Sequence, residues 1–461
     1  MGIQGLLQFI KPLLKEKHIS EYQGERLAVD SYCWLHKAVY SCGRDLATGK
    51  PTRSYLLIRH INYVVKKAVD LKNMGIQLVM VFDGAPMPCK ENTEEERRQT
   101  RSESLKKAEE LEKLGNIKEA ERYYTRAVDV TPSLAKEVIE ELQKYNIECI
   151  VAPYEADAQL AYLCKIGYVS GVISEDSDLI VFQSTKVLYK LENNGYVKEL
   201  KLDDLWNHPN YNMKKWTHDQ FVLMCVLAGC DYLKSVKSIG LKTAYKYVSQ
   251  HGELRQIISK LKRDIGKVPI DYEEQFLKAL YSFKYHKVFC PLKGQMVNLN
   301  PIPEDIEMTD LSFLGETLSQ DVILGIARGR LNPFTKQPFC EQNLKRKIDE
   351  IFQPLSKPSG IKKVKVEEEI KSLAQQIRFE RKTQRSKYFD KGEGPQDGNT
   401  ENPQEDFIDK KPFPIIAEIL NPFKPPFANQ NAIEKTGPLD FLQNLSFRKI
   451  SLTTIFSEST N

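Results

Sequence analysis

The stretch Gly171-Val-Ile-Ser-Glu-Asp176-Ser-Asp178 is a short run of small and β-branched residues that ends in acids. Three similar runs precede it in the chain: Arg26-Leu-Ala-Val-Asp30, Leu78-Val-Met-Val-Phe-Asp83 and Ile147-Glu-Cys-Ile-Val-Ala-Pro153, the last leading into Glu155. Runs this short and this rich in valine and isoleucine are typical of buried strands. We therefore expect four strands, each followed closely by an acid.

Longer segments between these runs have the spacing of amphipathic helices. Residues 55–74 and 134–145 both repeat apolar side chains every three or four positions. Strands that alternate with helices predict an α/β fold with a doubly wound, mostly parallel sheet and helices on both faces. Ligands of such sheets bind at the carboxyl ends of the strands. One edge of the sheet should therefore collect the acids.

Two further local patterns enlarge this group of acids. Glu155-Ala-Asp157 stands in the first turn of a predicted helix, and Gly229-Cys-Asp231 follows the apolar helix 221–227. The complete set that we expect at the edge is Asp30, Asp83, Glu155, Asp157, Asp176, Asp178 and Asp231.

So many carboxylates close together repel one another unless something neutralises them. Either divalent metal ions do so, or the acids do not converge and serve as ordinary helix caps. Capping is the better explanation for any one acid alone, whereas a metal site better explains all seven. Oxygen ligands suit Mg²⁺ or Mn²⁺, and two such ions can clamp and hydrolyse a phosphodiester.

The segment from Lys90 to Tyr124 is dominated by charged residues, and we expect two helices broken near Gly115-Asn116 that stand off the core. Lys90, Arg97, Arg98 and Arg101 are predicted to share one helical face, which would suit a phosphate polymer. A solvated charged helix explains the pattern equally well. A weaker signal is Lys237-Ser-Ile-Gly240-Leu-Lys242-Thr243, where Gly240 allows close approach and the N–H groups of residues 241–243 would face a phosphate.

Composition narrows the remaining choices. The net charge is only +5, so a basic surface must be local, and the nine cysteines include no Cys-x-x-Cys pair, as in a reduced cytosolic or nuclear protein. No apolar run is long enough to span a membrane. From about Lys345 the sequence becomes charged and rich in Pro and Gly, which predicts a largely disordered tail.

Several blocks over residues 1–340 together resemble the 5′-nuclease superfamily of flap endonucleases, and within it the exonuclease 1 group. The blocks are Met1-Gly-Ile-Gln-Gly-Leu-Leu, Ala28-Val-Asp30-Ser-Tyr-Cys-Trp-Leu-His36-Lys, Val81-Phe-Asp83-Gly84, Ala152-Pro-Tyr-Glu155-Ala-Asp157-Ala-Gln-Leu-Ala, Glu175-Asp-Ser-Asp178 and Gly229-Cys-Asp231-Tyr. The resemblance implies two metal ions, Mg²⁺ with Mn²⁺ as a substitute, held by the seven acids, with Asp157 bridging them.

The resemblance also assigns roles to neighbouring residues. Lys90 and Arg97 match arch positions that steer the scissile phosphate, and Tyr32 and His36 match positions that stack on and orient the nucleotide at the cut. His36 favours the exonuclease 1 group over dedicated flap endonucleases. The N-terminal segment, with Ile3 to Leu7 as a wedge for the bent duplex, supplies the expected DNA contacts Gly2, Ile3 and Gln4. Arg98 and Arg101, which the helical spacing places beside Lys90 and Arg97, are further expected DNA contacts.

Residues 229–247 match a helix–two-turn–helix that grips duplex DNA through a K⁺ ion. Ser235 and Ile239 stand at ligand positions, while Ala228 and Ser238 replace the usual Ser and Gly and weaken the expected site. The DNA contacts implied for this motif are Ser235, Ile239, Gly240, Lys242 and Thr243.

The tail carries one further motif and completes the expected organisation. Arg385, Ser386, Lys387, Tyr388 and Phe389 resemble the peptide by which mismatch-repair nucleases bind a MutL-homologue partner. We expect an N-terminal nuclease region (1–100), the rest of a helical arch (101–137), an internal nuclease region (138–232), a helix–two-turn–helix with further helices (233–345) and the tail (346–461).

These expectations describe a monomeric nuclear enzyme with no membrane contact. It would degrade duplex DNA from nicks, gaps, recessed 5′ ends or 5′ flaps, in mismatch repair, end resection and recombination. Two rivals stay open: a dedicated flap endonuclease of replication, and a non-catalytic DNA-binding scaffold. The first normally carries a clear sliding-clamp motif after the core, and the second should lack at least one acid.

Overall fold

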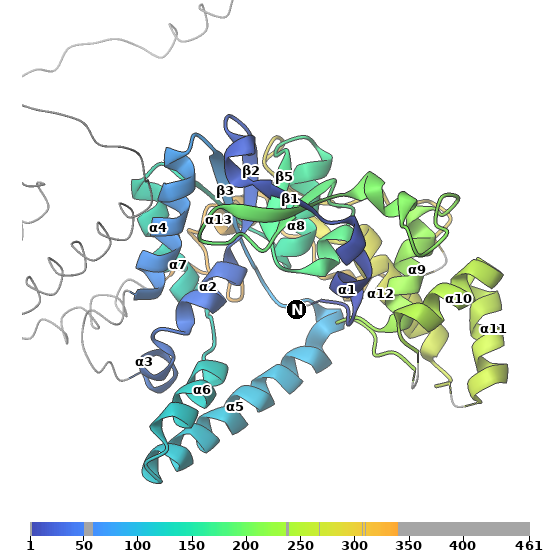
Figure 1. The fold of residues 1–461 in the computed structure, drawn as a ribbon, viewed down its shortest axis with the longest axis horizontal. Coiled ribbons are helices and arrows are strands. Elements are labelled where there is room, and N and C mark those ends of the chain that lie inside the picture. Colours follow the sequence, from blue (N-terminus) through green and yellow to red (C-terminus); the bar gives the residue numbers. More distant parts are fainter. Residues whose placement is uncertain are drawn as a thin grey trace, which may run out of the picture. The chain divides into compact units, whose positions relative to one another are not determined.

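The computed structural model describes residues 2–49, 59–236, 239–266, 268–306, 308 and 310–339, which all belong to one compact unit. Its centre is a seven-stranded sheet in the order β1-β7-β6-β5-β2-β3-β4 (Figure 1). The strands are β1 (Lys15–His18), β2 (Arg26–Asp30), β3 (Gln77–Phe82), β4 (Glu148–Val151), β5 (Gly171–Ser174), β6 (Lys186–Tyr189) and β7 (Tyr196–Lys201).

The five strands β6, β5, β2, β3 and β4 are parallel to one another. β7 pairs antiparallel with β6, and β1 pairs antiparallel with β7, so these two strands form an antiparallel edge. The four strands expected from the sequence are present, and β1, β6 and β7 were not expected. β1 and β7 carry several charged side chains, which masks the hydrophobic signal that an edge strand gives. The prediction of a doubly wound, mostly parallel sheet is confirmed.

Side chains alternate between two apolar layers along each central strand. Leu27 and Val29 of β2 face one layer, and Ala28 faces the other. The first layer is covered by α2 (Ser31–Val39), α4 (Arg59–Asn73) and α7 (Pro132–Lys144). The second is covered by α1 (Leu6–Ile10), α8 (Ala156–Lys165) and α9 (His218–Ala228). Both faces of the sheet are therefore buried.

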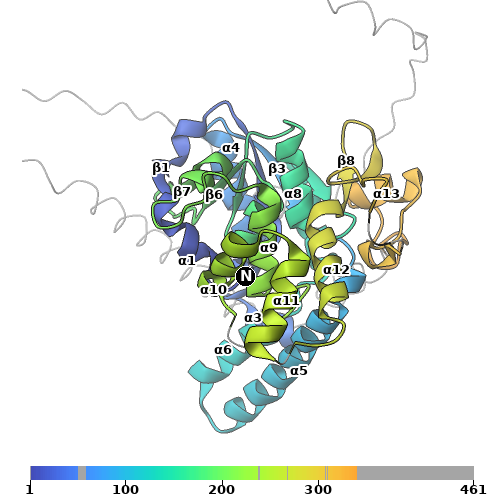
Figure 2. The same cartoon turned by 90° about the vertical axis from the view of Figure 1, so that its right-hand side faces the viewer.

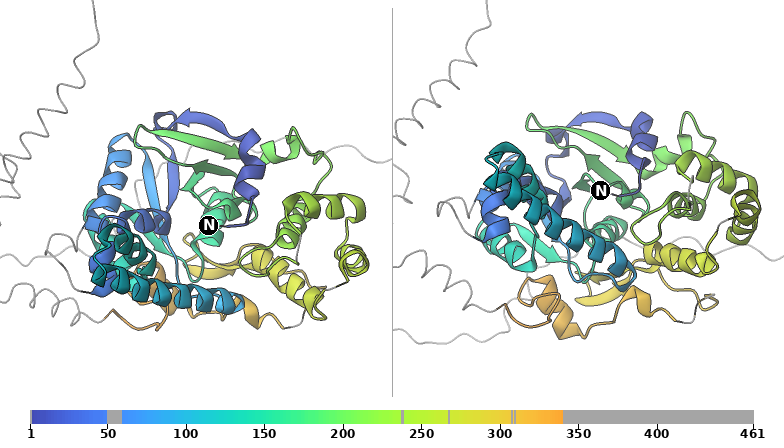
Figure 3. Two further views of the ribbon diagram at one scale, coloured as in Figure 1. Left: turned by 60° about the horizontal axis from the view of Figure 1, so that its bottom comes forward. Right: turned by 90° about the horizontal axis from the view of Figure 1, so that it is seen from below.

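The expected arch is formed by a long helix and its shorter partner. Turn η4 (Pro88–Lys90) leads into α5 (Glu91–Lys113), and α6 (Ile117–Ala127) returns after the predicted break at residues 114–116. Figures 1 and 3 show this helical pair projecting from the sheet. The second helix of the arch, α6, packs on α3 (Gly43–Thr48), where a Cβ added to Gly43 would lie 2.7 Å from Oγ1 of Thr125.

The remaining helices lie beyond α9. Figure 2 shows α9 grouped with α10 (Leu241–His251), α11 (Leu254–Ile265) and α12 (Tyr272–Tyr285). The hairpin β8 (Lys287–Cys290) and β9 (Gln295–Asn298) precedes α13 (Gln320–Ala327). Short 3-10 turns are η1 (Lys11–Leu13), η2 (Ile19–Tyr22), η5 (Ser177–Ile180), η6 (Leu202–Asn207) and η7 (Ser312–Leu314). Across the described part of the chain, no helix combines the length and apolar character required to cross a membrane.

Gly84 fixes the ends of β3 and β4 against each other. Its backbone N–H donates to the carbonyl oxygen of Tyr154 at 2.6 Å, and an added Cβ would stand 2.0 Å from the carbonyl oxygen of Ala152. Backbone atoms cannot move aside as a flexible side chain could. The close approach therefore sets the separation of Asp83 from Glu155.

We predict that Gly84→Ala lowers the free energy of unfolding by about 1–3 kcal/mol, the usual cost of overpacking. Gly240→Ala is the matched control, because a Cβ there meets no atom within 4 Å. Urea unfolding of both variants measures the difference. Equal midpoints for Gly84→Ala and the wild type would contradict the proposed constraint.

Candidate metal centre

Six of the seven expected acids follow the carboxyl ends of four adjacent parallel strands. Asp30 ends β2 and Asp83 follows β3, while the acids after β4 and β5 are Glu155, Asp157, Asp176 and Asp178. Asp231 arrives from another direction, three residues after α9. The fold therefore brings together acids that are as much as 201 positions apart in the sequence.

Three of these acids also cap helices. Asp30 accepts a hydrogen bond from the N–H of Cys33 at 3.1 Å in the first turn of α2, and Asp176 accepts one from the N–H of Asp178 at 3.0 Å. Asp83 reaches across to α8 and accepts from the N–H of Ala156 at 2.7 Å. Capping and convergence, which the sequence set against each other, are thus both true of these residues.

Asp157 stands at the centre of the group. Burial raises its pKa well above the ordinary range, and the negative charges around it raise the pKa further; they belong to Asp176, Asp30, Asp83 and Asp178. Burial, followed by the nearby Asp30, raises the pKa of Asp83 to about 7. Burial and Asp176 raise the pKa of Asp178 to about 8. This side of the site holds more negative charge than the protein neutralises.

Glu155 and Asp231 form the other side, where arch cations supply the counter-charge. Nζ of Lys90 lies 3.0 Å from Oε1 of Glu155 and 3.0 Å from Oδ2 of Asp231. Nη2 of Arg97 lies 2.8 Å from the same oxygen of Asp231. Burial alone would raise the pKa of both acids, but Lys90 together with His286 and Tyr232 lowers the pKa of Glu155 below its ordinary value, and Lys90 together with Arg97 does the same for Asp231.

The side chains of the acid group have the chemistry that a divalent cation requires, although they are not arranged around one point. Among the described residues, no three His, Cys, Asp or Glu side chains already surround one point closely enough to bind a metal ion. The available donors are carboxylate oxygens, which suit Mg²⁺ and Mn²⁺. Asp83, Asp157 and Asp178 have raised pKa values that a cation would relieve.

Gly2 lies directly against this group. An added Cβ would lie 2.3 Å from Oδ1 of Asp176 and 2.7 Å from Oδ1 of Asp178, and the residue has a φ of +92°. Only glycine meets both conditions without strain. The N–H of Ile3 then donates to Oδ1 of Asp178 at 2.8 Å. The amino-terminal segment is therefore built into the site.

Comparisons with known proteins identify relatives of this chain. The XPG N-terminal domain matches residues 1–104, and the XPG I-region matches residues 146–231. The chain is 38% identical to exonuclease 1 of Arabidopsis thaliana over 79% of this chain and 49% of that protein. It is 37% identical to exodeoxyribonuclease 1 of Schizosaccharomyces pombe over 79% of this chain and 63% of that protein.

A third relative is matched over most of its length. The chain is 37% identical to the DNA damage-inducible protein DIN7 of Saccharomyces cerevisiae over 66% of this chain and 70% of that protein. The chain belongs to the exonuclease 1 family. It spans about half of the Arabidopsis relative and less than two thirds of the S. pombe relative.

The four cations that the helical spacing predicts on one face of the arch do not all point the same way. Lys90 and Arg97 face the acids, and Arg101 turns toward Asp129, with the guanidinium 3.5 Å from its carboxylate. Arg98 does not share their face: its side chain is 71% exposed and pairs with Glu95. One step along a helix rotates a side chain by about 100°, which explains why Arg98 diverges from Arg97.

Tyr32 and His36 occupy successive turns of α2, with ring centroids 6.3 Å apart. The two rings differ in surroundings. Burial and then the charge of Asp83 raise the pKa of Tyr32. His36 reaches the surface, but the loss of water around its ring lowers its pKa.

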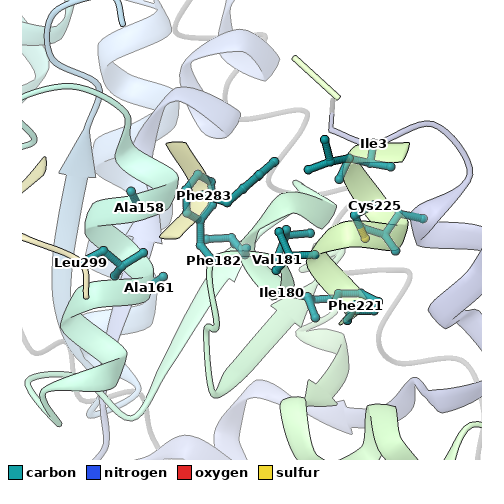
Figure 4. Close-up of a cluster of buried hydrophobic side chains, with 14 of the residues drawn as sticks. Ile3, Ala158, Ala161, Ile180, Val181, Phe182, Phe221, Cys225, Phe283 and Leu299 are labelled. Atoms are coloured by element: carbon teal, nitrogen blue, oxygen red, sulfur yellow. The ribbon is translucent and has the colours of Figure 1, made fainter. Parts of the chain in front are cut away.

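The expectation that Ile3 contributes its side chain to a DNA wedge is wrong. Ile3 is 3% exposed and Leu6 is fully buried, and Figure 4 shows Ile3 near Cys225 in the apolar cluster. Leu7 is half-buried, and Gln4 and Gly5 are exposed. An amphipathic N-terminal segment must bury its largest apolar groups, so within the stretch 3–7 it is Gln4, Gly5 and Leu7 that a duplex could contact.

The helix–two-turn–helix consists of α9, the turns at residues 229–240 and α10. Lys237 and Ser238 lie outside the described residues. Ser235 and Gly240 are exposed, whereas the side chain of Ile239 is buried, so Ile239 could offer a cation only its carbonyl oxygen. The N–H of Thr243 donates to the carbonyl oxygen of Gly240 at 3.0 Å, which corrects the expectation that it faces a phosphate. Lys242 is exposed on α10.

Sequence reasoning missed several contacts at the centre. The Tyr232 hydroxyl donates to Oε2 of Glu155 at 2.6 Å, and Thr93 Oγ1 donates to the Asp231 carbonyl oxygen at 2.9 Å. Ser174 donates to Asp30. In the sequence, Tyr232 and Ser174 stand next to acidic motifs, and this position was the one signal that could have identified them. The proposed partner motif, Arg385 to Phe389, lies outside the described residues.

A cleft of about 670 Å³ opens beside Gly2. It is lined by Gln4 and Gln8 of the amino-terminal segment and by three lysines, Lys11, Lys190 and Lys198. Ser177, which lies between two of the acids, also borders it. A basic surface that was not apparent from the modest net charge therefore adjoins the candidate metal centre.

We predict that Mg²⁺ stabilises the protein more at about pH 8.5 than at about pH 6. The raised pKa values of Asp83 and Asp178, about 7 and 8, mean that the folded state holds protons that the unfolded state releases. Without metal, stability therefore falls as the pH rises towards 8 and these acids ionise. A bound cation removes that penalty only where the acids are ionised.

Thermal unfolding with and without Mg²⁺, at matched ionic strength, measures this difference. Asp203→Asn, which alters an exposed acid on η6, should respond as the wild type does. A shift that is the same at both pH values would contradict the assignment of the raised pKa values to the cation site.

Proposed function

We propose that the chain is a metal-dependent 5′-to-3′ exonuclease on double-stranded DNA that also cleaves 5′ flaps. The observation that carries the proposal is the position of Lys90, at the base of the arch and between Glu155 and Asp231. A phosphate-binding cation is thereby held within the group of acids that would bind the metal ions. Kinship with proteins named exonuclease 1 supports the same activity.

The seven acids would hold two Mg²⁺ ions, or Mn²⁺ in their place, which supply an activated water and stabilise the leaving oxygen. Once Glu155 and Asp231 are neutralised, Lys90 and Arg97 lose the attraction that now holds them and become available to the scissile phosphate. Lys90 is mostly buried, so its interaction with a phosphate would be little screened by solvent.

Tyr32 and His36 would orient the nucleotide at the cut. Their rings lie on one side of α2 on successive turns, an arrangement that offers flat surfaces to unpaired bases. The site combines stacking rings with arch cations, and both would engage a strand end drawn away from its duplex. This combination supports cleavage at a strand end rather than within a strand.

The duplex would extend from the acids across two basic surfaces. The first is the cleft lined by Lys11, Lys190 and Lys198. The second is the helix–two-turn–helix, where exposed Ser235, Gly240 and Lys242 would contact the backbone, aided by a K⁺ ion at the Ser235 turn. Substrates of this geometry are duplexes with nicks, gaps, recessed 5′ ends or 5′ flaps.

The proposed cellular role follows from this substrate class. We infer a nuclear monomer that acts in mismatch repair, end resection and recombination, and that binds a MutL-homologue partner through residues 385–389. The support is the family membership, the DNA-damage wording in the name of one relative, and the sequence of the tail motif.

We predict that Asp176→Asn reduces cleavage to background while DNA binding in Ca²⁺ stays within about threefold of the wild type, since the change removes a negative charge but little volume. Asp203→Asn, an exposed acid on η6, is the control and should cleave normally. Cleavage is followed on a labelled duplex, and binding by fluorescence anisotropy. Persistent cleavage by Asp176→Asn would refute the metal assignment.

The exonuclease is distinguished from its nearest rival by comparing a recessed 5′-labelled duplex with a 5′-flap substrate in Mg²⁺. We expect labelled mononucleotides or very short oligonucleotides from the recessed end. Cleavage confined to flaps would identify a dedicated flap endonuclease, and no cleavage of either substrate would favour a DNA-binding scaffold.

Lys190→Ala should weaken DNA binding and reduce the salt dependence of log Kd by about one counter-ion. Lys144→Ala is the matched control, because Lys144 ends α7 just before β4 and so lies at the opposite edge of the sheet from the acids. Anisotropy titrations over a range of salt concentrations measure both slopes. Equal slopes for the two variants would exclude the lysine cleft from the DNA path.

A further inference from the structure

We propose that Ser174 is a positioning residue that holds Asp30 so that only its Oδ1 oxygen is available to the cation site. The inference rests on the proposed function, since it concerns how one of the proposed ligands is presented. Ser174 is the last residue of β5 and is 2% exposed. Its hydroxyl is shared between two of the seven acids: it bonds to the carboxylate of Asp30 at the end of β2 and to the backbone N–H of Asp176, two residues beyond β5.

The direction of these hydrogen bonds is fixed by the backbone. The N–H of Asp176 donates to Oγ of Ser174 at 3.0 Å, so this oxygen acts as the acceptor there. Oγ of Ser174 also lies 2.7 Å from Oδ2 of Asp30. An ionised carboxylate can only accept, so the single hydroxyl proton of Ser174 must point to Asp30.

Cys33 completes the environment of Asp30. Its Sγ donates to Oδ2 of Asp30 at 2.8 Å, and its backbone N–H donates to Oδ1 at 3.1 Å. A carboxylate has about four lone-pair positions, two on each oxygen. Ser174 and the Cys33 thiol occupy both positions on Oδ2, and the Cys33 N–H occupies one on Oδ1. One position, on Oδ1, remains for a metal ion or a water bound to it.

The same serine couples Asp30 to Asp176. β2 and β5 are parallel neighbours with Val29 paired to Ile173, so Asp30 and Ser174 are the next residues along the two strands. A movement of the Asp30 carboxylate, or of the backbone at Asp176, must therefore stretch a hydrogen bond to one shared, buried hydroxyl. Hydrogen bonds of this kind, from residues that do not themselves touch the metal, commonly change metal affinity by about 10- to 100-fold.

The experiment is a titration of the metal-free protein with Mn²⁺, in which free Mn²⁺ is measured by electron paramagnetic resonance. Ser174→Ala should raise the Mn²⁺ dissociation constant by about 10- to 100-fold. Ser174→Thr, which keeps the hydroxyl, should stay close to the wild type, and Ser174→Cys, a weaker donor, should fall between them. The Mg²⁺ concentration for half-maximal cleavage should be lowest for the wild type and Ser174→Thr, higher for Ser174→Cys and highest for Ser174→Ala.

Ser184→Ala provides the matched control. Ser184 is 1% exposed, and its Oγ has no hydrogen-bond partner among the described residues, so the variant loses a buried hydroxyl without altering an acid. Its Mn²⁺ affinity should equal that of the wild type. Thermal unfolding of each metal-free variant shows whether Ser174→Ala is folded, and if it is not, Ser174→Cys and Ser174→Thr carry the comparison.

The outcomes separate this inference from the proposed function. Tight Mn²⁺ binding by the wild type together with equal affinity in Ser174→Ala, or an equal loss in Ser184→Ala, would overturn the role of Ser174 alone. A wild type that binds no Mn²⁺ would overturn the metal site and this inference with it. A Mn²⁺-bound structure with Oδ2 of Asp30 as a ligand would likewise contradict the assignment of Oδ1.

Discussion

Repulsion among carboxylates at one edge of the sheet is the constraint on which the rest of the structure depends. A doubly wound parallel sheet delivers the residues after its strands to a single edge, and here those residues are acids. The protein relieves part of the repulsion by hydrogen bonds from helix amino termini to Asp30, Asp83 and Asp176. Lys90 and Arg97 neutralise another part of the negative charge. The raised pKa values of Asp83 and Asp178 show that some repulsion remains.

The same counter-charge ties the arch to the catalytic edge. Lys90, Thr93 and Arg97 all contact Asp231, so the base of the arch is held by a residue of the acid group. Near its other end the arch packs through α6 onto α3, the helix that follows α2. Since α2 carries Tyr32 and His36, the arch adjoins the acids at its base and, through α3, the helix next to the proposed stacking rings.

The sequence was most informative where hydrophobic pattern and local chemistry agreed. The strands that precede the acids and the helix α9 were predicted because each is a continuous apolar run, and the break in the arch was predicted because Gly115 is a clear helix breaker. β1 and β7 were missed because edge strands with charged side chains give little periodic signal. Ile3 and Arg98 were assigned to DNA from their place in motifs, yet burial and helical rotation direct them elsewhere. Contacts such as Ser174 with Asp30 depend on which strands are neighbours, and a single sequence does not contain that information.

The central claim is that the seven acids bind the divalent ions that cleave DNA. Anomalous diffraction from crystals of the protein with Mn²⁺ and a recessed DNA end tests it most directly. We predict two Mn²⁺ peaks about 3.5–4 Å apart among the acids, with the terminal phosphodiester between them and Lys90 turned toward the phosphate. Peaks elsewhere, or no peak while Lys90 still bridges Glu155 and Asp231, would contradict the account.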